Sequence, residues 1–225
     1  LITIKKPKLS KNSKEMIRQL PPKISSGFLT GMNEFVDQFF AAQLAIGSIT
    51  AINYGIKIPA FIVSILIIAM GNVLLPYFSR LISTDLAQAY RQLFKMLKSI
   101  FVGAVIIVII SIFLSDDIIS ILFERNEFTS DDTVIVSNIQ KIALLYIPFY
   151  LCTLVLVRFL TSINKNKFMA WVSLFGLIAN IILNIILIKK FEVYGLILAT
   201  TIIYVIISIF YVSFTIKQYK LSKST

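Results

Sequence analysis

Apolar residues fall in six long runs along the chain, separated by short segments that hold most of the charges. A helix rises about 1.5 Å per residue, so about 20 apolar residues cross the roughly 30 Å hydrocarbon core of a bilayer. The runs predict an all-α integral membrane fold with six transmembrane helices, at residues 24–45, 48–79, 97–115, 133–162, 168–188 and 193–216. Residues 1–23 are expected to form a basic arm in the cytoplasm or at the membrane interface, and residues 217–225 a basic cytoplasmic tail.

Two of the predicted spans are longer than a bilayer requires and contain an internal proline, Pro59 in the second and Pro148 in the fourth. Proline removes a backbone donor and clashes with the preceding turn, so a kink is expected at each. Tilt or an extension beyond the membrane accounts for the excess length.

Composition supports the membrane assignment, because 57% of the 225 residues are hydrophobic and only 15% are charged. The chain has no histidine, which excludes histidine-based catalytic triads, metal sites and proton relays. The single cysteine, Cys152, cannot form an internal disulfide and is expected to be a buried structural thiol. No catalytic residue, metal ligand or cofactor is expected.

The net charge of +11 is distributed unevenly. Of the 22 lysines and arginines, 17 fall in the arm, the tail and two loops that a six-helix topology places on one side. Positive loops are retained in the cytoplasm, so both chain ends are expected there. Retained positive loops also explain the basic balance without nucleic acid, and anionic membrane lipids are the expected counterpart.

Charged residues lie deep inside the first two predicted spans. Glu34 and Asp37 share one helical face, about 16 Å and 21 Å from the cytoplasmic edge at Lys23, and Lys57 lies about 15 Å below the outer edge. Two readings stay open. Glu34 and Lys57 form a structural ion pair, or they line a wet cavity and meet a charged substrate, with Glu34 and Asp37 setting the local charge and responding to ions.

Three more polar residues are candidates for the same cavity. Asn180 and Asn184 are four residues apart in the fifth span and share a face, which suits interhelical hydrogen bonds or a polar cavity wall. Arg158 lies near the cytoplasmic end of the fourth span, as a headgroup anchor or a phosphate contact.

Four segments, in order and at matching separations, resemble the MurJ/MviN family of lipid II flippases, within the superfamily that also contains polysaccharide exporters and multidrug antiporters. The segments are AAQLAIGSITAINYGIKI, LLPYFSRL, ILFERNEFTSDDT and NIILNIILIKKFEVYGLILATTI. The resemblance implies one six-helix lobe of a two-lobe, alternating-access carrier in the bacterial inner membrane, which moves an undecaprenyl-diphosphate-linked cell-wall precursor for peptidoglycan synthesis. The partner implied is an amino-terminal lobe that this chain does not contain.

The resemblance also assigns a role to Lys57. It stands where the family's Tyr-Ala-x-Arg pattern places a positive cavity residue, and here the pattern reads Tyr54, Gly55, Ile56, Lys57. Lysine keeps the charge but not the bidentate geometry of arginine. A second departure is Asn126, where the outer loop of the family usually has glycine.

Three functions are therefore carried forward. The first is half of a lipid II flippase, the second is a flippase for O-antigen or exopolysaccharide lipid carriers, and the third is a non-transporting remnant or partner of a separate amino-terminal lobe. An enzyme is not expected. The candidate substrate-contacting residues are Lys57, Glu34, Asp37, Asn180, Asn184 and Arg158.

Overall fold

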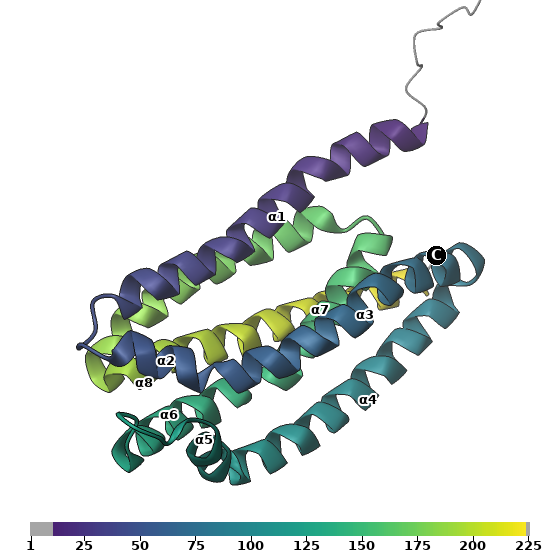
Figure 1. Cartoon of the computed structure of the whole chain (residues 1–225). Coiled ribbons are helices and arrows are strands. Elements are labelled where there is room, and N and C mark those ends of the chain that lie inside the picture. The colour runs from purple at the N-terminus through teal and green to yellow at the C-terminus, as the bar shows by residue number, and fades with distance from the viewer. Residues whose placement is uncertain (1–10, 224–225) are drawn as a thin grey trace, which may run out of the picture.

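The computed structural model describes residues 11–223, so the outermost parts of the predicted arm and tail lie outside it. The expected all-α fold is confirmed for the described residues (Figure 1). The helices are α1 (Lys11–Ala41), α2 (Ser48–Gly55), α3 (Lys57–Thr84), α4 (Leu86–Phe113), α5 (Ser115–Phe123), α6 (Ser130–Leu144), α7 (Ile147–Ser162) and α8 (Asn166–Ser222).

The two long spans with internal prolines are each divided into two helices. The second span breaks at Ile56, between α2 and α3, and the fourth breaks after α6, before Ile147. Pro59 is the third residue of α3 and Pro148 the second of α7. Proline is tolerated in the first turn, where its missing N–H has no intrahelical acceptor. The interruptions expected in these two spans are therefore confirmed, and each lies just before its proline.

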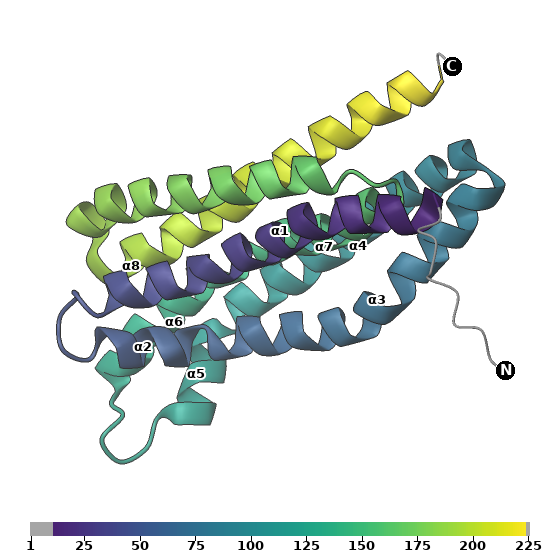
Figure 2. The ribbon, with the colours of Figure 1, turned by 90° about the horizontal axis from the view of Figure 1, so that it is seen from above.

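Helix α8 folds back on itself at Glu192, whose backbone takes φ 49° and ψ −125°. Its two halves run side by side in opposite directions and cover the fifth and sixth predicted spans (Figures 1 and 2). The reversal is tight, because a Cβ atom on Gly195 would overlap the backbone carbonyl of Leu187. Only glycine fits there without a shift of the backbone.

Within the described residues, four helical stretches are long and apolar enough to cross a membrane: α3, α4, Ser130–Ser162 and α8. Helix α1 is not among them, because Asn33, Glu34, Asp37 and Gln38 lower its hydropathy. Helix α1 also begins at Lys11, so residues 11–23 of the predicted arm and most of the first predicted span belong to one continuous helix. The six separate crossings therefore stay a prediction.

The helices form an elongated bundle in which α1 lies along the first half of α8 (Figure 1). Helices α3 and α4 pack against α7, and α2, α5 and α6 gather at one end. The α3–α4 turn, the α7–α8 turn and both described chain ends lie at the opposite end (Figures 1 and 2). The loops that carry most of the positive charge therefore share one end of the bundle.

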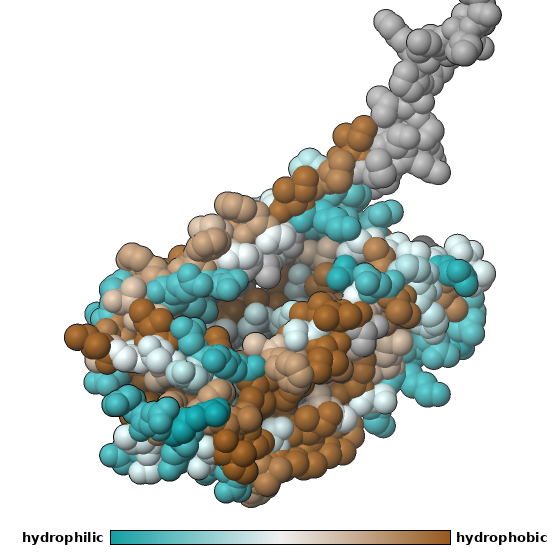
Figure 3. Space-filling model, viewed as in Figure 1, coloured by the Kyte–Doolittle hydropathy of each residue, from teal (hydrophilic) through white to brown (hydrophobic). Residues whose placement is uncertain are grey.

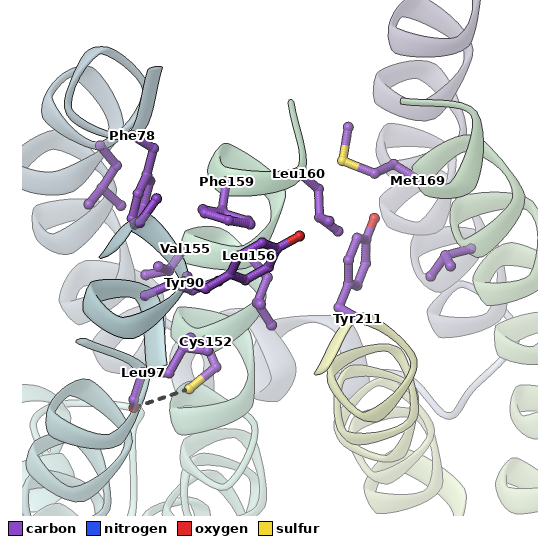
Figure 4. Close-up of a cluster of buried hydrophobic side chains, with 14 residues drawn as sticks. Phe78, Tyr90, Leu97, Cys152, Val155, Leu156, Phe159, Leu160, Met169 and Tyr211 are labelled. Carbon is purple, nitrogen blue, oxygen red and sulfur yellow. Dashed lines mark hydrogen bonds between the residues drawn. The ribbon is translucent and has the colours of Figure 1, made fainter. Parts of the chain in front are cut away.

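A cluster of buried aromatic and aliphatic side chains joins α3, α4, α7 and α8 (Figure 4). Phe159 packs edge-on against Phe78, with ring centroids 5.2 Å apart, and its ring is tilted against Tyr90 at 4.9 Å. Cys152 is buried in this cluster, with its sulfur 3.9 Å from the carbonyl oxygen of Leu97. The thiol packs as an apolar group with one weak hydrogen bond, as expected of a structural cysteine.

On the face shown in Figure 3, hydrophobic residues predominate between two hydrophilic ends. On α4, large apolar side chains are exposed along the middle of the helix, at Ile106, Ile107, Ile109 and Ile110. Exposure of such residues in water would be unfavourable, whereas contact with acyl chains is not.

Candidate functional site

Asp37 forms a polar contact between α1 and α8. Asn184 donates a hydrogen bond from Nδ2 to Asp37 Oδ1 at 3.0 Å, and Thr200 donates from Oγ1 to Asp37 Oδ2, also at 3.0 Å. Asn184 Nδ2 also lies 3.2 Å from Asn180 Oδ1. Each carboxylate oxygen of Asp37 therefore has a donor, which lowers the cost of keeping this group in an apolar bundle.

The reversal of α8 explains why these residues meet. Asn184 precedes Glu192 by eight residues and Thr200 follows it by eight, so the hairpin brings both to one level. Asn180 lies one turn from Asn184 on the same face. The sequence pattern predicted Asp37, Asn180 and Asn184 in one site but not Thr200, whose equal distance from the reversal was the available signal.

The same cluster contains a buried acceptor without a partner, Asn184 Oδ1. An unpaired buried oxygen costs roughly 1–3 kcal/mol. The Nδ2 atom of the same amide donates to Asp37 Oδ1 and lies 3.2 Å from Asn180 Oδ1. One carboxylate and two neutral amides thus meet between α1 and α8, and one amide oxygen there has no partner.

Glu34 and Lys57 do not form the ion pair considered above. Within residues 11–223 no ion pair within 4.0 Å joins them, and both side chains are exposed. Helix α1 packs mainly on α8, and the space-filling view shows a hollow between α1 and α3 (Figure 3). The structure therefore gives no support to the pair, and it leaves the two residues on helices that border this hollow.

Lys57, the first residue of α3, lies against aromatic rings. Its Nζ atom is 4.3 Å from the ring centroid of Tyr54 and 5.4 Å from that of Phe123. The Tyr54 ring is in edge contact with Phe123, at 4.9 Å, and with Phe128, at 5.5 Å. We call Tyr54, Phe123 and Phe128 the aromatic cluster. Its rings come from α2, from the end of α5 and from the α5–α6 loop.

Arg158 is half-buried on α7 and faces α3. Its Nη2 atom lies 3.6 Å from the position that a Cβ atom would take on Gly71 of α3. Its Nε atom is buried without a hydrogen-bond partner. The guanidinium thus packs between helices and does not extend along the bundle surface, which argues against a headgroup anchor.

The acidic segment between α4 and α6 has structural partners. Asp132 and Thr129 form a capping box at the start of α6, and Thr133 donates to Glu124 at 2.9 Å. Asn126 has φ 53°, in the left-handed region that asparagine tolerates better than other residues with a side chain. Asparagine can therefore replace the glycine expected here. Among the side chains that the structure describes, no three histidine, cysteine, aspartate or glutamate residues are grouped to hold a metal ion.

A family model described as lipid II flippase MurJ matches residues 2–225, nearly the whole chain. The chain belongs to the MurJ lipid II flippase family. The resemblance that the four sequence segments suggested is thereby confirmed. A flippase is a transporter, so the expectation of a protein that is not an enzyme is confirmed as well.

Individual MurJ proteins agree with this assignment. A probable lipid II flippase MurJ of Helicobacter pylori strain J99 is 26% identical over 193 residues, which are 85% of this chain and 42% of that relative. A solved MurJ structure, in an inward closed conformation, aligns with a TM-score of 0.76 and 28% identity over 95% of this chain and 46% of its own. A MATE transporter in complex with MaD3S has the same fold, with a TM-score of 0.77 at 18% identity over 90% of this chain and 45% of its own.

The chain spans less than half the length of the curated MurJ relatives that it matches. Together with the four apolar helical stretches, MurJ membership makes it a multi-pass protein of the inner membrane.

Proposed function

We propose that this chain forms one lobe of a MurJ flippase that moves lipid II, an undecaprenyl-diphosphate-linked precursor, to the outer leaflet. The observation that carries the proposal is the exposed ammonium of Lys57 on α3, the helix that borders the hollow opposite α1. A diphosphate is the part of such a substrate that a cation inside a membrane recognises best.

In this mechanism Lys57 contacts the diphosphate from one wall of the cavity, and the amino-terminal lobe supplies the opposite wall. Glu34, exposed on α1, adds negative charge near the same level and limits how tightly the anion is held. Arg158 offers a second cation between α3 and α7. Alternating access follows if the two lobes rock about the bound headgroup, so that each leaflet sees the cavity in turn.

The proposal includes six membrane crossings with both chain ends in the cytoplasm. Helix α1 supplies the first crossing, with Asp37 turned toward α8, and the two halves of α8 supply the last two. The positive loops at one end of the bundle support this orientation, since such loops stay in the cytoplasm.

We also propose that the Asp37 cluster binds a monovalent cation or a proton. The sequence alone predicts no metal site, and the partnerless Asn184 Oδ1 atom is the observation that favours an ion site here. One carboxylate among neutral oxygens matches a single positive charge better than a divalent ion. Sodium should raise the melting temperature of the wild-type full chain in detergent relative to choline, and should have no such effect on Asp37→Asn. Equal melting temperatures of the wild type in sodium and in choline would contradict the proposed sodium site.

The flippase proposal is tested by rescue of a strain depleted of its lipid II flippase, with the full-length gene. Lys57→Met should abolish rescue, Lys57→Arg should retain it, and Lys98→Met, at an exposed lysine on α4, serves as the control. Full rescue by Lys57→Met at normal protein levels would contradict the proposed phosphate contact.

Rescue also separates the alternatives. An O-antigen or exopolysaccharide flippase would restore only a strain that lacks the corresponding exporter, because its glycan differs. A non-transporting remnant would restore neither strain, even when the amino-terminal lobe is co-expressed.

A further inference from the structure

The ammonium of Lys57 lies against rings from two separate parts of the chain. Tyr54 is three residues earlier, on the other side of the break at Ile56. Phe123 is far away in sequence, at the end of α5. We call residues 123–129, which lead from α5 to α6, the outer segment. The lysine thus contacts the preceding helix α2 through Tyr54 and the end of α5 through Phe123.

Close packing of α2 on α6 fixes this arrangement. A Cβ atom on Gly55 would lie 2.8 Å from Ile139 Cβ and 3.0 Å from the carbonyl oxygen of Val136, so the backbone of α2 rests directly on α6. Tyr54, the neighbouring residue, is thereby held against Phe123 and Phe128. The aromatic cluster is a contact between α2 and the α5–α6 segment, and Lys57 covers it.

Aromatic ring faces attract cations without using the hydrogens of an ammonium group. A lysine has three N–H donors on a flexible four-carbon stem, and an uncovered stem of this kind samples many rotamers. Rings on one side of Nζ restrict these rotamers and leave donors on the other side for an anion. The cluster therefore suits a role in positioning the charge, and it does not compete with a phosphate for it.

We propose that Phe123 and Tyr54 are positioning residues for Lys57, and that binding of a diphosphate at Lys57 is thereby transmitted to the outer segment at 123–129. This inference rests on the proposed phosphate contact of Lys57. Coupling is reciprocal: if the ring orders the ammonium for the anion, the bound anion must order the ring and the loop that carries it.

The test is a double-mutant cycle on the full-length protein in lipid nanodiscs, with undecaprenyl diphosphate as the probe. Phe123→Leu removes the ring and keeps an apolar side chain, and it should raise the dissociation constant about two- to fivefold. The same change in the Lys57→Met background should have no further effect. Phe123→Tyr should restore wild-type binding, and Phe113→Leu, at a ring that is 81% exposed on α4, should leave it unchanged.

An equal effect of Phe123→Leu in both backgrounds would overturn the inference, because the ring would then act without the lysine. If Lys57→Met alone binds the probe as tightly as the wild type, the phosphate contact is overturned, and the positioning role with it. Hydrogen exchange gives a second readout. Amides of residues 124–129 should exchange more slowly with the probe in the wild type but not in Lys57→Met, and unaltered exchange in both would refute the transmission.

Discussion

Two helix contacts carry the candidate residues, and they are built differently. Helix α1 meets α8 through hydrogen bonds between Asp37 and the side chains of Asn184 and Thr200. Helix α2 meets α6 through the close approach of Gly55 to Ile139. The first contact depends on polar groups with specific partners, and the second depends on shape.

Because the two contacts are built differently, replacing Asp37 and replacing Lys57 should affect folding differently. Asp37 has donors on both oxygens, so its removal disturbs the bundle as well as any ion that it binds. Lys57 is exposed beside a contact that shape alone maintains, so its charge can change with little effect on folding. A charged group that can be replaced with little effect on folding is the better candidate for substrate contact.

The largest expected effect is on the hairpin that presents Asn184 and Thr200 to α1. Gly195→Ala would place a methyl group against the backbone carbonyl of Leu187, which cannot move aside as a side chain can. We expect a loss of about 3 kcal/mol in the free energy of unfolding, measured by denaturant titration of the full chain in detergent. Gly103→Ala, where no atom lies within 4 Å, is the control and should be neutral or slightly stabilising.

The contact between α2 and α6 should be the next most sensitive. Gly55→Ala brings a methyl group against Ile139 and the carbonyl of Val136, and should cost about 2 kcal/mol. The loss should be accompanied by weaker probe binding at Lys57, since Tyr54 moves with α2. Unfolding and binding that both match the wild type would mean that α2 does not rest on α6 as described.

A smaller effect is expected at the polar contact. Asp37→Leu leaves the donors of Asn184 and Thr200 without their acceptor, and hydrogen bonds between membrane helices contribute about 1 kcal/mol. Glu34→Leu, one turn earlier and exposed, is the matched control and should have no such cost. Equal losses in both variants would indicate that the hydrogen bonds of Asp37 add nothing to the packing of α1 on α8.

Much of this arrangement follows from sequence, because helix length and hydropathy are local properties. The apolar runs predicted the helical segments of α3, α4, α7 and both halves of α8. The run at 24–45 was less informative, since its polar residues bring hydropathy below that of a membrane helix. Its place in the bundle depends on α8, which sequence periodicity does not reveal.

The site could be predicted from the sequence where polar residues within one apolar run share a helical face or carry a charge. Asn180 and Asn184 share a face by spacing, and Asp37 was found because carboxylates are rare in apolar runs. The aromatic cluster at Lys57 was not found, because Phe123 and Tyr54 are far apart in sequence and become neighbours only when α2 packs on α6. The Glu34–Lys57 pair was suggested by matched depth, which gives the level of two residues but not the direction that each one faces.

The smallest effect concerns the α5–α6 segment that carries Phe123. Lys141 donates to both oxygens of Asp116, at 2.7 and 2.8 Å, and these hydrogen bonds lower the pKa of Asp116 from its ordinary 3.8. The folded state thus favours the charged carboxylate. The stabilisation is complete above pH 3.8 and is lost as the pH falls through that value toward the lower pKa of the folded chain. Because the pair is exposed, its contribution is at most about 1 kcal/mol.

Between neutral pH and about pH 3 the melting temperature should therefore fall slightly more in the wild type than in Asp116→Asn. Asp117→Asn, at the neighbouring carboxylate, should behave as the wild type, and an identical pH response in all three proteins would show that the pair does not hold α5 to α6.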